Sequence, residues 1–169
     1  MSVRRMSGFT IFEIMVTMAI AAVVAAFAIP SFQAVMTSSR LNAAAQEVSN
    51  SVALARNTAI SRRRSVVWVP SAGSSPVWKL AMDSSVGPVL ARHAIEGNMS
   101  LAYSVAFTEM TFQPNGYVQK TNGGATSAMD VTITLCDTST RKESGRNVFI
   151  TRVGRVRTAQ HANATVCNP

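Results

Sequence analysis

The stretch Gly8-Phe9-Thr10-Ile11-Phe12-Glu13 opens an apolar run that extends as far as Ile29. The run has about the 20 residues that a helix needs to cross a bilayer. Glu13 is the charged residue inside it. A carboxylate at membrane depth costs about 2.5–3.5 kcal/mol on insertion scales, so such a group generally has a partner and a function. We therefore expect residues 9–29 to form a membrane-spanning helix with a functional acidic side chain near its start.

The residues before this run predict which side of the membrane the rest of the chain occupies. Arg4 and Arg5 directly precede it, and positively charged flanks tend to stay in the cytoplasm. Everything after Ile29 is then expected across the membrane, as in a single-pass protein. That topology places Cys136 and Cys167, the two cysteines of the chain, in an oxidising compartment where a disulfide can persist. Two cysteines allow one intramolecular pairing.

Gly8-Phe9-Thr10 followed by Glu13 resembles the class III signal of type IV pilins and type II secretion pseudopilins. The resemblance implies that residues 1–8 are a leader, which prepilin peptidase removes by cutting after Gly8, and that the new terminus, Phe9, is N-methylated. It also implies that the Glu13 carboxylate meets the terminal amine of a neighbouring subunit during filament assembly. Two desolvated opposite charges neutralise each other, and their pairing sets the axial register of neighbouring helices.

Three other interpretations of the N-terminal segment stay open. Ala26-Phe27-Ala28 has the pattern of a signal-peptidase site, which would make the segment an ordinary secretory leader. The charge inside the apolar region, and a basic leader running directly into it, count against that interpretation. The segment could also be a plain single-pass anchor, or the short motif could match by chance.

From residue 30 to residue 64 the pattern predicts that the helix continues as an amphipathic half. Pro30 could kink it, because proline removes a backbone hydrogen bond. Apolar residues recur at alternating intervals of four and three, as on one helical face: Leu41, Ala45, Val48, Val52, Ala55 and Ala59. We expect the helix to end near Arg62-Arg63-Arg64, where cations favour the negative end of the helix dipole. The alternative for this basic triplet is a nucleic-acid contact.

Residues 65–169 change to short β-branched and aromatic runs separated by turn residues, which predicts an antiparallel β-sheet domain. Pro114-Asn115-Gly116 predicts a tight hairpin turn. Trp68 and Trp78 are expected in the core. Loops or exposed segments are expected at residues 70–76, 121–127 and 158–163, and strands at residues 65–69, 77–82, 89–92, 99–105, 109–113, 117–118, 131–135 and 147–152.

The soluble portion resembles the branch of the pilin family that contains GspH, FimT and FimU. Three stretches carry this resemblance: Phe112-x-Pro114-Asn115-Gly116, the strand at 131–136, and Asn147-Val148-Phe149-Ile150 leading to Gly154-Arg155-Val156-Arg157. The resemblance implies an α+β, pilin-like fold, in which a long N-terminal helix packs on an antiparallel β-sheet. It also implies partners, namely prepilin peptidase and other major and minor pilins. The expected location is the inner membrane, with the soluble domain in the periplasm, and then the filament.

The basic C-terminal tail is the second informative feature. Six basic residues and two acidic ones lie between the cysteines: Arg141, Lys142, Arg146, Arg152, Arg155 and Arg157 against Asp137 and Glu143. A Cys136–Cys167 bridge would close a loop of about 30 residues, worth roughly 3–4 kcal/mol. It would also tie the tail to the sheet and restrict the arginines. The whole chain has a formal net charge of +8 at pH 7, which supports non-specific attraction to nucleic acid and nothing more definite.

Gly154-Arg155-Val156-Arg157 resembles the DNA-contacting tail of FimT-type minor pilins, which serve natural transformation. The resemblance makes Arg152, Arg155 and Arg157 candidate contacts to phosphate, because a guanidinium can donate two parallel hydrogen bonds to an oxyanion. Three such contacts predict a salt slope of about −3 on duplex DNA and weak, sequence-independent binding. No aromatic residue is expected among these arginines, so base stacking lacks support. The alternative is a purely structural role, such as protecting an edge strand.

The sequence offers no basis for an enzyme, a metal site or a cofactor. His93 and His161 lack cysteine or carboxylate residues at zinc-ligand spacing, and no nucleophile elbow or phosphate loop is present. We therefore expect a minor pilin that primes or completes a type IV pilus at or near its tip, with possible DNA binding. The alternatives are a GspH-like pseudopilin of a type II secretion system without DNA binding, and an unrelated anchored binding module.

Overall fold

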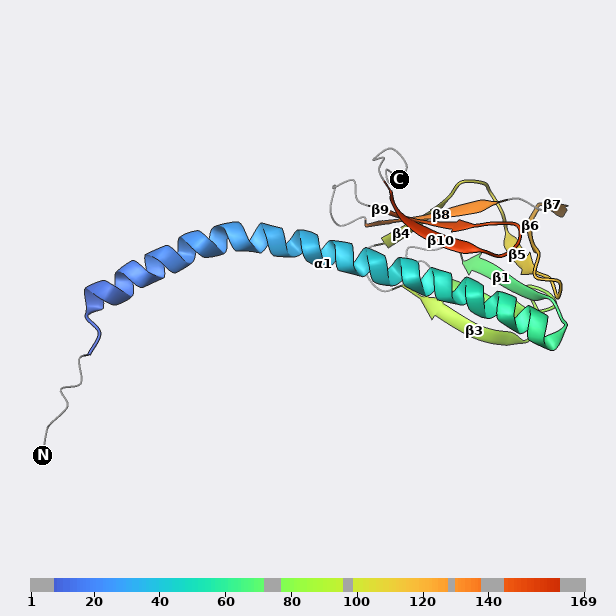
Figure 1. Cartoon of the computed structure of the whole chain (residues 1–169), viewed down its shortest axis with the longest axis horizontal. Helices are drawn as coiled ribbons and strands as arrows, with labels where there is room; N and C mark the ends of the chain where they lie inside the picture. Colours follow the sequence, from blue (N-terminus) through green and yellow to red (C-terminus); the bar gives the residue numbers. More distant parts are fainter. Residues whose placement is uncertain (1–7, 72–76, 96–98, 128–129, 138–144, 162–169) are drawn as a thin grey trace, which may run out of the picture. The chain divides into compact units, whose positions relative to one another are not determined.

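The computed structural model describes residues 8–71, 77–95, 99–127, 130–137 and 145–161. The chain divides into two compact units, Met1–Ser38 and Ser39–Pro169. One helix, α1 (Ile11–Arg62), belongs to both units, as Figure 1 shows. It ends within the basic triplet, so the predicted end of the helix is confirmed.

The second unit contains two antiparallel sheets. In the described part of the chain, the first has the strand order β3-β2-β1-β5-β6-β7 and the second has the order β10-β9-β8-β4. The strands are β1 (Val66–Ser71), β2 (Val77–Met82), β3 (Val89–Ala94), β4 (Met99–Tyr103), β5 (Glu109–Phe112), β6 (Val118–Asn122), β7 (Ala125–Ser127), β8 (Val131–Asp137), β9 (Gly145–Ile150) and β10 (Val156–His161). The chain thus leaves the first sheet after β3, contributes β4 to the second, and returns with β5 beside β1.

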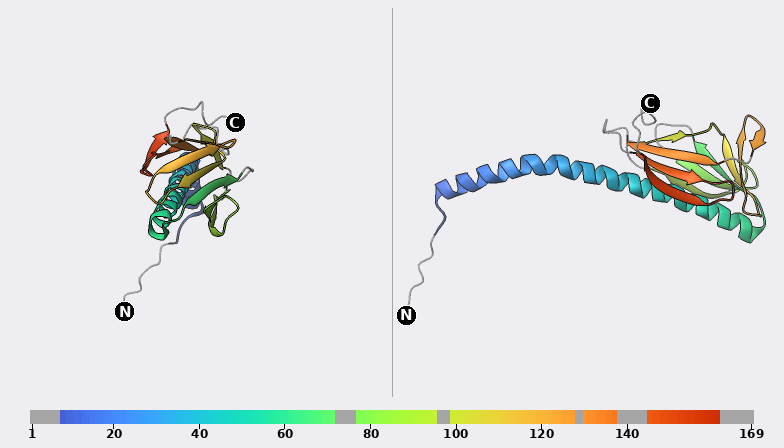
Figure 2. Two further views of the ribbon diagram at one scale, coloured as in Figure 1. Left: turned by 90° about the vertical axis from the view of Figure 1, so that its right-hand side faces the viewer. Right: turned by 45° about the horizontal axis from the view of Figure 1, so that its top comes forward.

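The core of this unit lies between the C-terminal part of α1 and the inner faces of both sheets (Figure 2). The predicted helical face is confirmed, because its six members are buried: Leu41, Ala45, Val48, Val52, Ala55 and Ala59. Three of the six are alanines, whose small side chains allow the helix to lie close to the sheets. Trp68 and Trp78 are fully buried and stack with their ring centroids 5.8 Å apart, so their predicted core position is also confirmed.

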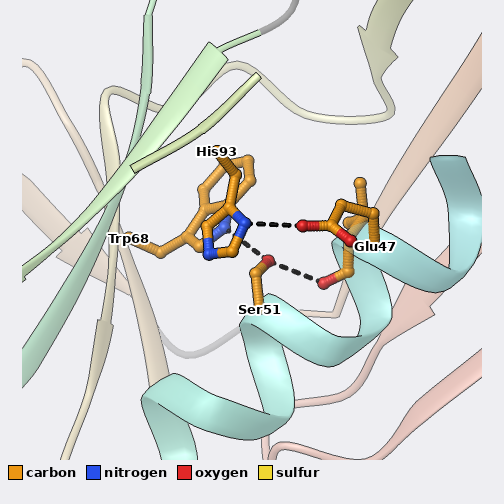
Figure 3. A network of polar contacts seen from close by, with 5 residues as sticks. Glu47, Ser51, Trp68 and His93 are labelled. Carbon is orange, nitrogen blue, oxygen red and sulfur yellow. Dashed lines mark hydrogen bonds and ion pairs between the residues drawn. The ribbon is translucent and has the colours of Figure 1, made fainter. Parts of the chain in front are cut away.

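Polar contacts fix α1 against the first sheet (Figure 3). The indole N–H of Trp68 donates to Ser51 Oγ at 3.1 Å, and the Ser51 hydroxyl donates to the Val48 carbonyl at 2.7 Å. His93 Nδ1 lies 2.6 Å from Glu47 Oε1, and its ring stacks on Trp78. His93 therefore serves packing between strand and helix.

The hairpin predicted at Pro114-Asn115-Gly116 is confirmed, since β5 and β6 pair with Phe112 opposite Val118. Gly116 has a φ of 83°, a left-handed conformation that glycine adopts at little cost. Asn115 Oδ1 accepts the Tyr117 N–H at 3.1 Å, as in an Asx turn.

One predicted loop and one predicted exposed segment contain strands. Residues 121–127, expected to be a loop, belong to a hairpin in which Thr121 pairs with Thr126. Gly123 and Gly124 have φ values of 57° and 88°, as a tight hairpin turn of the primed type requires. Residues 158–161, expected to be an exposed segment, form most of β10, which pairs with β9 along its length. A polar edge strand lacks the apolar alternation that marks a strand in sequence, and its partner supplies its hydrogen bonds.

Candidate functional site

The N-terminal end of α1 combines a helix cap with an unburied apolar surface. The Glu13 N–H donates to Thr10 Oγ1 at 3.2 Å, so Thr10 caps the helix and Glu13 lies in its first turn. Threonine followed three residues later by glutamate is the pattern of a capping box, a structural role for both residues that the pilin-like signal alone does not indicate. The segment Ile11–Ile29 has a mean hydropathy of 2.3 with none of it buried, and it is long and apolar enough to cross a membrane.

The turn between β9 and β10 holds Arg152 and Arg155, and Arg157 follows it in β10. The Thr151 N–H donates to the Arg155 carbonyl at 3.0 Å, and the Gly154 N–H donates to the Thr151 carbonyl at 2.8 Å. The Arg155 N–H donates to Thr151 Oγ1 at 3.1 Å. These hydrogen bonds fix the path of the backbone over five residues, so Arg152 and Arg155 project from a defined turn that leads directly into the strand carrying Arg157.

Gly154 is required in this turn for conformation and for space. Its φ is 72°, and a Cβ there would lie 2.5 Å from Arg56 Cδ and 3.2 Å from the Gly116 carbonyl oxygen. The Val118 N–H also donates to the Arg152 carbonyl at 2.8 Å. The two glycine-containing motifs of the family resemblance therefore meet over Arg56 of α1. This role of Arg56 could not be predicted from the sequence, because an arginine within a helix is ordinary.

Arg152, Arg155 and Arg157 are all exposed. Within the described ranges, their guanidinium groups take part in no ion pair or side-chain hydrogen bond. One acidic group lies nearby, since Asp130 Oδ1 accepts the backbone N–H of Arg152 at 3.0 Å. The three side chains thus keep their donors for an external oxyanion.

Other basic residues form polar side-chain contacts within the protein. Arg146 donates to Asn42 Oδ1 at 2.6 Å, and Arg64 forms an ion pair with Asp83. The pairing of Arg64 supports the structural interpretation of the basic triplet for that residue. Arg141 and Lys142 lie outside the described residues.

No aromatic residue interleaves the arginines along the chain, but the fold brings aromatic residues from other segments near them. Phe149 of β9 lies directly opposite Arg157 of β10, and 37% of the phenylalanine is exposed. Tyr117 is 48% exposed in the neighbouring turn. The sequence pattern does not reveal these neighbours, because pairing of strands and contact between turns bring together residues that are separate along the chain.

The remaining predicted sites fall partly outside the described residues. Cys136 is buried in β8 and is not a free thiol, but Cys167 lies outside those residues, so their pairing stays a prediction. Gly8 and Phe9 precede α1 and are exposed; cleavage and methylation there also stay predictions. Among the described residues, no three histidine, cysteine or carboxylate side chains are grouped as metal ligands.

A long helix with an unburied apolar N-terminal part, whose C-terminal part packs on antiparallel sheets, is the α+β pilin fold, and the predicted fold class is confirmed. The model of the family described as Type II transport protein GspH matches residues 44–154, and that of the prokaryotic N-terminal methylation motif matches residues 3–29. The chain belongs to the GspH family.

Two crystal structures of the type IV minor pilin FimU from Pseudomonas aeruginosa share this fold. One aligns with a TM-score of 0.58 at 20% identity, covering 76% of this chain and 100% of the other. The second has a TM-score of 0.60 at 21% identity, covering 78% and 98%. A search of curated protein sequences finds no match.

Membership of this family defines the chain as a minor pilin or pseudopilin of a type IV pilus or a type II secretion system. Such proteins are structural subunits and not enzymes. The methylation motif implies processing by prepilin peptidase and assembly with other pilins. The family likewise implies residence in a membrane before incorporation into a filament.

Proposed function

We propose that this protein is a minor pilin of a type IV filament system, assembled at or near the filament tip, which primes or completes the pilus. We further propose that Arg152, Arg155 and Arg157 bind DNA during natural transformation. The observation that carries the DNA proposal is the position of the three arginines. Their exposed guanidinium groups have no protein partner among the described residues, and they lie in or directly after a turn fixed by hydrogen bonds.

Assembly begins with processing of the N-terminus in this proposal. Prepilin peptidase cuts after Gly8, and Phe9 becomes the methylated terminus. The exposed position of both residues before α1 is compatible with access by a peptidase. The apolar helix then waits in the inner membrane, and Glu13 pairs with the terminal amine of a neighbouring subunit. Intact-mass spectrometry of the mature protein tests the first step; a start other than methylated Phe9 contradicts it.

The DNA proposal is tested by a gel-shift series on duplexes of different sequence. We expect Arg155→Gln/Arg157→Gln to lose most binding, with little dependence on base sequence in the parent and a salt slope of about −3. Arg40→Gln/Arg92→Gln is the matched control, because it removes two exposed arginines elsewhere and lowers the net charge equally. An equal loss of DNA binding in the control would show that the effect depends on net charge alone. A parent protein that fails to bind DNA at low salt would exclude DNA binding.

We also propose a Cys136–Cys167 disulfide that ties the end of the chain to β8. The absence of a free thiol at Cys136 supports it. Peptide mapping without reduction should yield one cross-linked peptide containing both cysteines. Two separate, alkylatable cysteine peptides from periplasmic protein would refute the bridge.

A second candidate is a GspH-like pseudopilin of a type II secretion system that does not bind DNA. The family description favours this host, and Asp130 beside Arg152 suits a structural role of the turn. The genes next to this one distinguish the two systems, since pilus and secretion components are encoded in different clusters.

A further inference from the structure

The outer face of the second sheet carries an aromatic ring next to two of the arginines. In the β9–β10 ladder, Arg157 lies opposite Phe149, while Val148 and Ile150 on either side of the phenylalanine are buried. Because side chains alternate along a strand, Phe149 and Arg157 both point away from the core. Directly opposed residues of antiparallel strands have Cβ atoms about 5 Å apart. Arg155, two residues before Arg157, is exposed as well.

A second ring adjoins the turn that holds Arg152. The Val118 N–H contacts the Arg152 carbonyl at 2.8 Å, and the Gly116 carbonyl oxygen lies beside Gly154. Because these two contacts flank the same short segment, Tyr117 lies alongside Val153. Both are nearly half exposed, at 48% and 45%. The arginine turn thus lies between two segments that each carry a partly exposed aromatic residue, Phe149 in β9 and Tyr117 in the neighbouring turn.

We propose that this surface, formed by Tyr117, Phe149 and the three arginines, binds single-stranded nucleic acid. Bases would stack on the two rings while the guanidinium groups contact the phosphates. This inference rests on the proposed DNA-binding function and specifies the form of its ligand. Stacking on aromatic rings tolerates any base, because every base has a π-face.

Comparison with two other ligands, a duplex and an acidic peptide, favours a single strand. A duplex keeps its bases inside the helix, so it can use the arginines but leaves both rings exposed to water. An acidic peptide could pair with the guanidinium groups, but it does not in general supply a flat partner for each ring. A single strand presents phosphates and unpaired bases in alternation. It can therefore contact both the arginines and the aromatic rings of this surface.

The test compares a labelled oligothymidylate with a duplex of equal length, using the full chain in detergent micelles and fluorescence anisotropy. We expect the parent to bind the single strand more tightly. Tyr117→Leu and Phe149→Leu retain apolar bulk but remove the π-face, and each should weaken single-strand binding about tenfold while changing duplex binding little. Tyr117→Phe and Phe149→Trp should bind like the parent, and thymidylate should quench the fluorescence of the introduced tryptophan, since Trp68 and Trp78 are buried.

The outcomes separate this inference from the function on which it rests. If both leucine variants bind the single strand like the parent, while Arg155→Gln/Arg157→Gln abolishes duplex binding, the rings play no part and the phosphate contacts stand. If the leucine variants lose duplex binding equally, stacking is refuted. If they bind DNA normally but fail to co-assemble with a second pilin, the surface is a protein interface. No binding of either ligand by the parent overturns both proposals.

Discussion

At the scale of single residues, the arginine turn depends on a glycine that no other residue replaces without strain. Gly154 combines a left-handed φ of 72° with backbone and side-chain atoms where a Cβ would lie. Its neighbour Arg155 projects outward from the same turn. The glycine therefore positions the arginines, although it contacts no ligand.

Gly154→Ala is expected to lower the free energy of unfolding by about 2–4 kcal/mol, from the left-handed conformation and the clash together. Gly123→Ala is the matched control. Its φ is also positive, at 57°, but no atom lies within 4 Å of its Cβ position, so it should cost only about 1–2 kcal/mol. Urea unfolding followed by tryptophan fluorescence gives both values. Equal losses of unfolding free energy in the two variants would show that the Arg56 side chain moves aside without strain.

The side chain of Tyr103 makes the free energy of unfolding depend on pH. Burial raises the pKa of Tyr103 to about 12, whereas a tyrosine in an unfolded chain has a pKa near 10. The folded state thus holds the phenolic proton more tightly, and this stabilisation is complete below pH 10. It is lost as the pH rises toward 12, by about 2 kcal/mol. Tyr103→Phe should flatten this part of the stability curve, and an unchanged alkaline slope would contradict the burial effect.

At the scale of elements, α1 is held to the first sheet by apolar packing and by one buried hydrogen bond that specifies its position. Ser51 Oγ accepts the indole N–H of Trp68, and both residues are buried. A buried donor without an acceptor costs more than the hydrogen bond itself contributes. The register of helix against strand therefore depends on this contact.

Ser51→Ala should lower the free energy of unfolding by about 1–3 kcal/mol, because the Trp68 N–H is left without its acceptor. Ser49→Ala is the control, since among the described residues the Ser49 hydroxyl donates only to the carbonyl of Ala45 in its own helix. Alanine has the higher helix propensity, so the control should be near neutral. A neutral Ser51→Ala would mean that another group takes over the indole N–H.

The sequence predicted elements with a strong period or a definite turn signal. The face from Leu41 to Ala59 and the hairpin at Asn115-Gly116 are of this kind. The sequence did not predict β7 and β10 as strands, because β7 is short and β10 is polar. The backbone hydrogen bonds of both depend on a partner strand. The candidate site likewise has a part that could be predicted and a part that could not. Its arginines could be predicted because they belong to a recognisable motif. Arg56, Tyr117 and Phe149 join them only through tertiary contacts between separate elements.

At the scale of the whole molecule, the two units have different physical requirements. The unit Ser39–Pro169 buries its own core. The apolar segment Ile11–Ile29 has none of its surface buried within the protein, so it needs lipid or other subunits to cover it. Such a chain suits a subunit that is stored in a membrane and then transferred into a filament. Glu13 is the charged residue of this segment, and we propose that its charge is neutralised during this transfer.

The central claim, that the Glu13 charge directs assembly, is tested most directly by filament incorporation of Glu13→Gln. Glutamine keeps the size of the side chain and can still support the capping pattern with Thr10, so the change isolates the charge. Immunoblots of sheared filaments from cells should show strong loss of this variant, with normal membrane levels and normal incorporation of the control Glu109→Gln. Incorporation of Glu13→Gln equal to that of the parent would contradict the account.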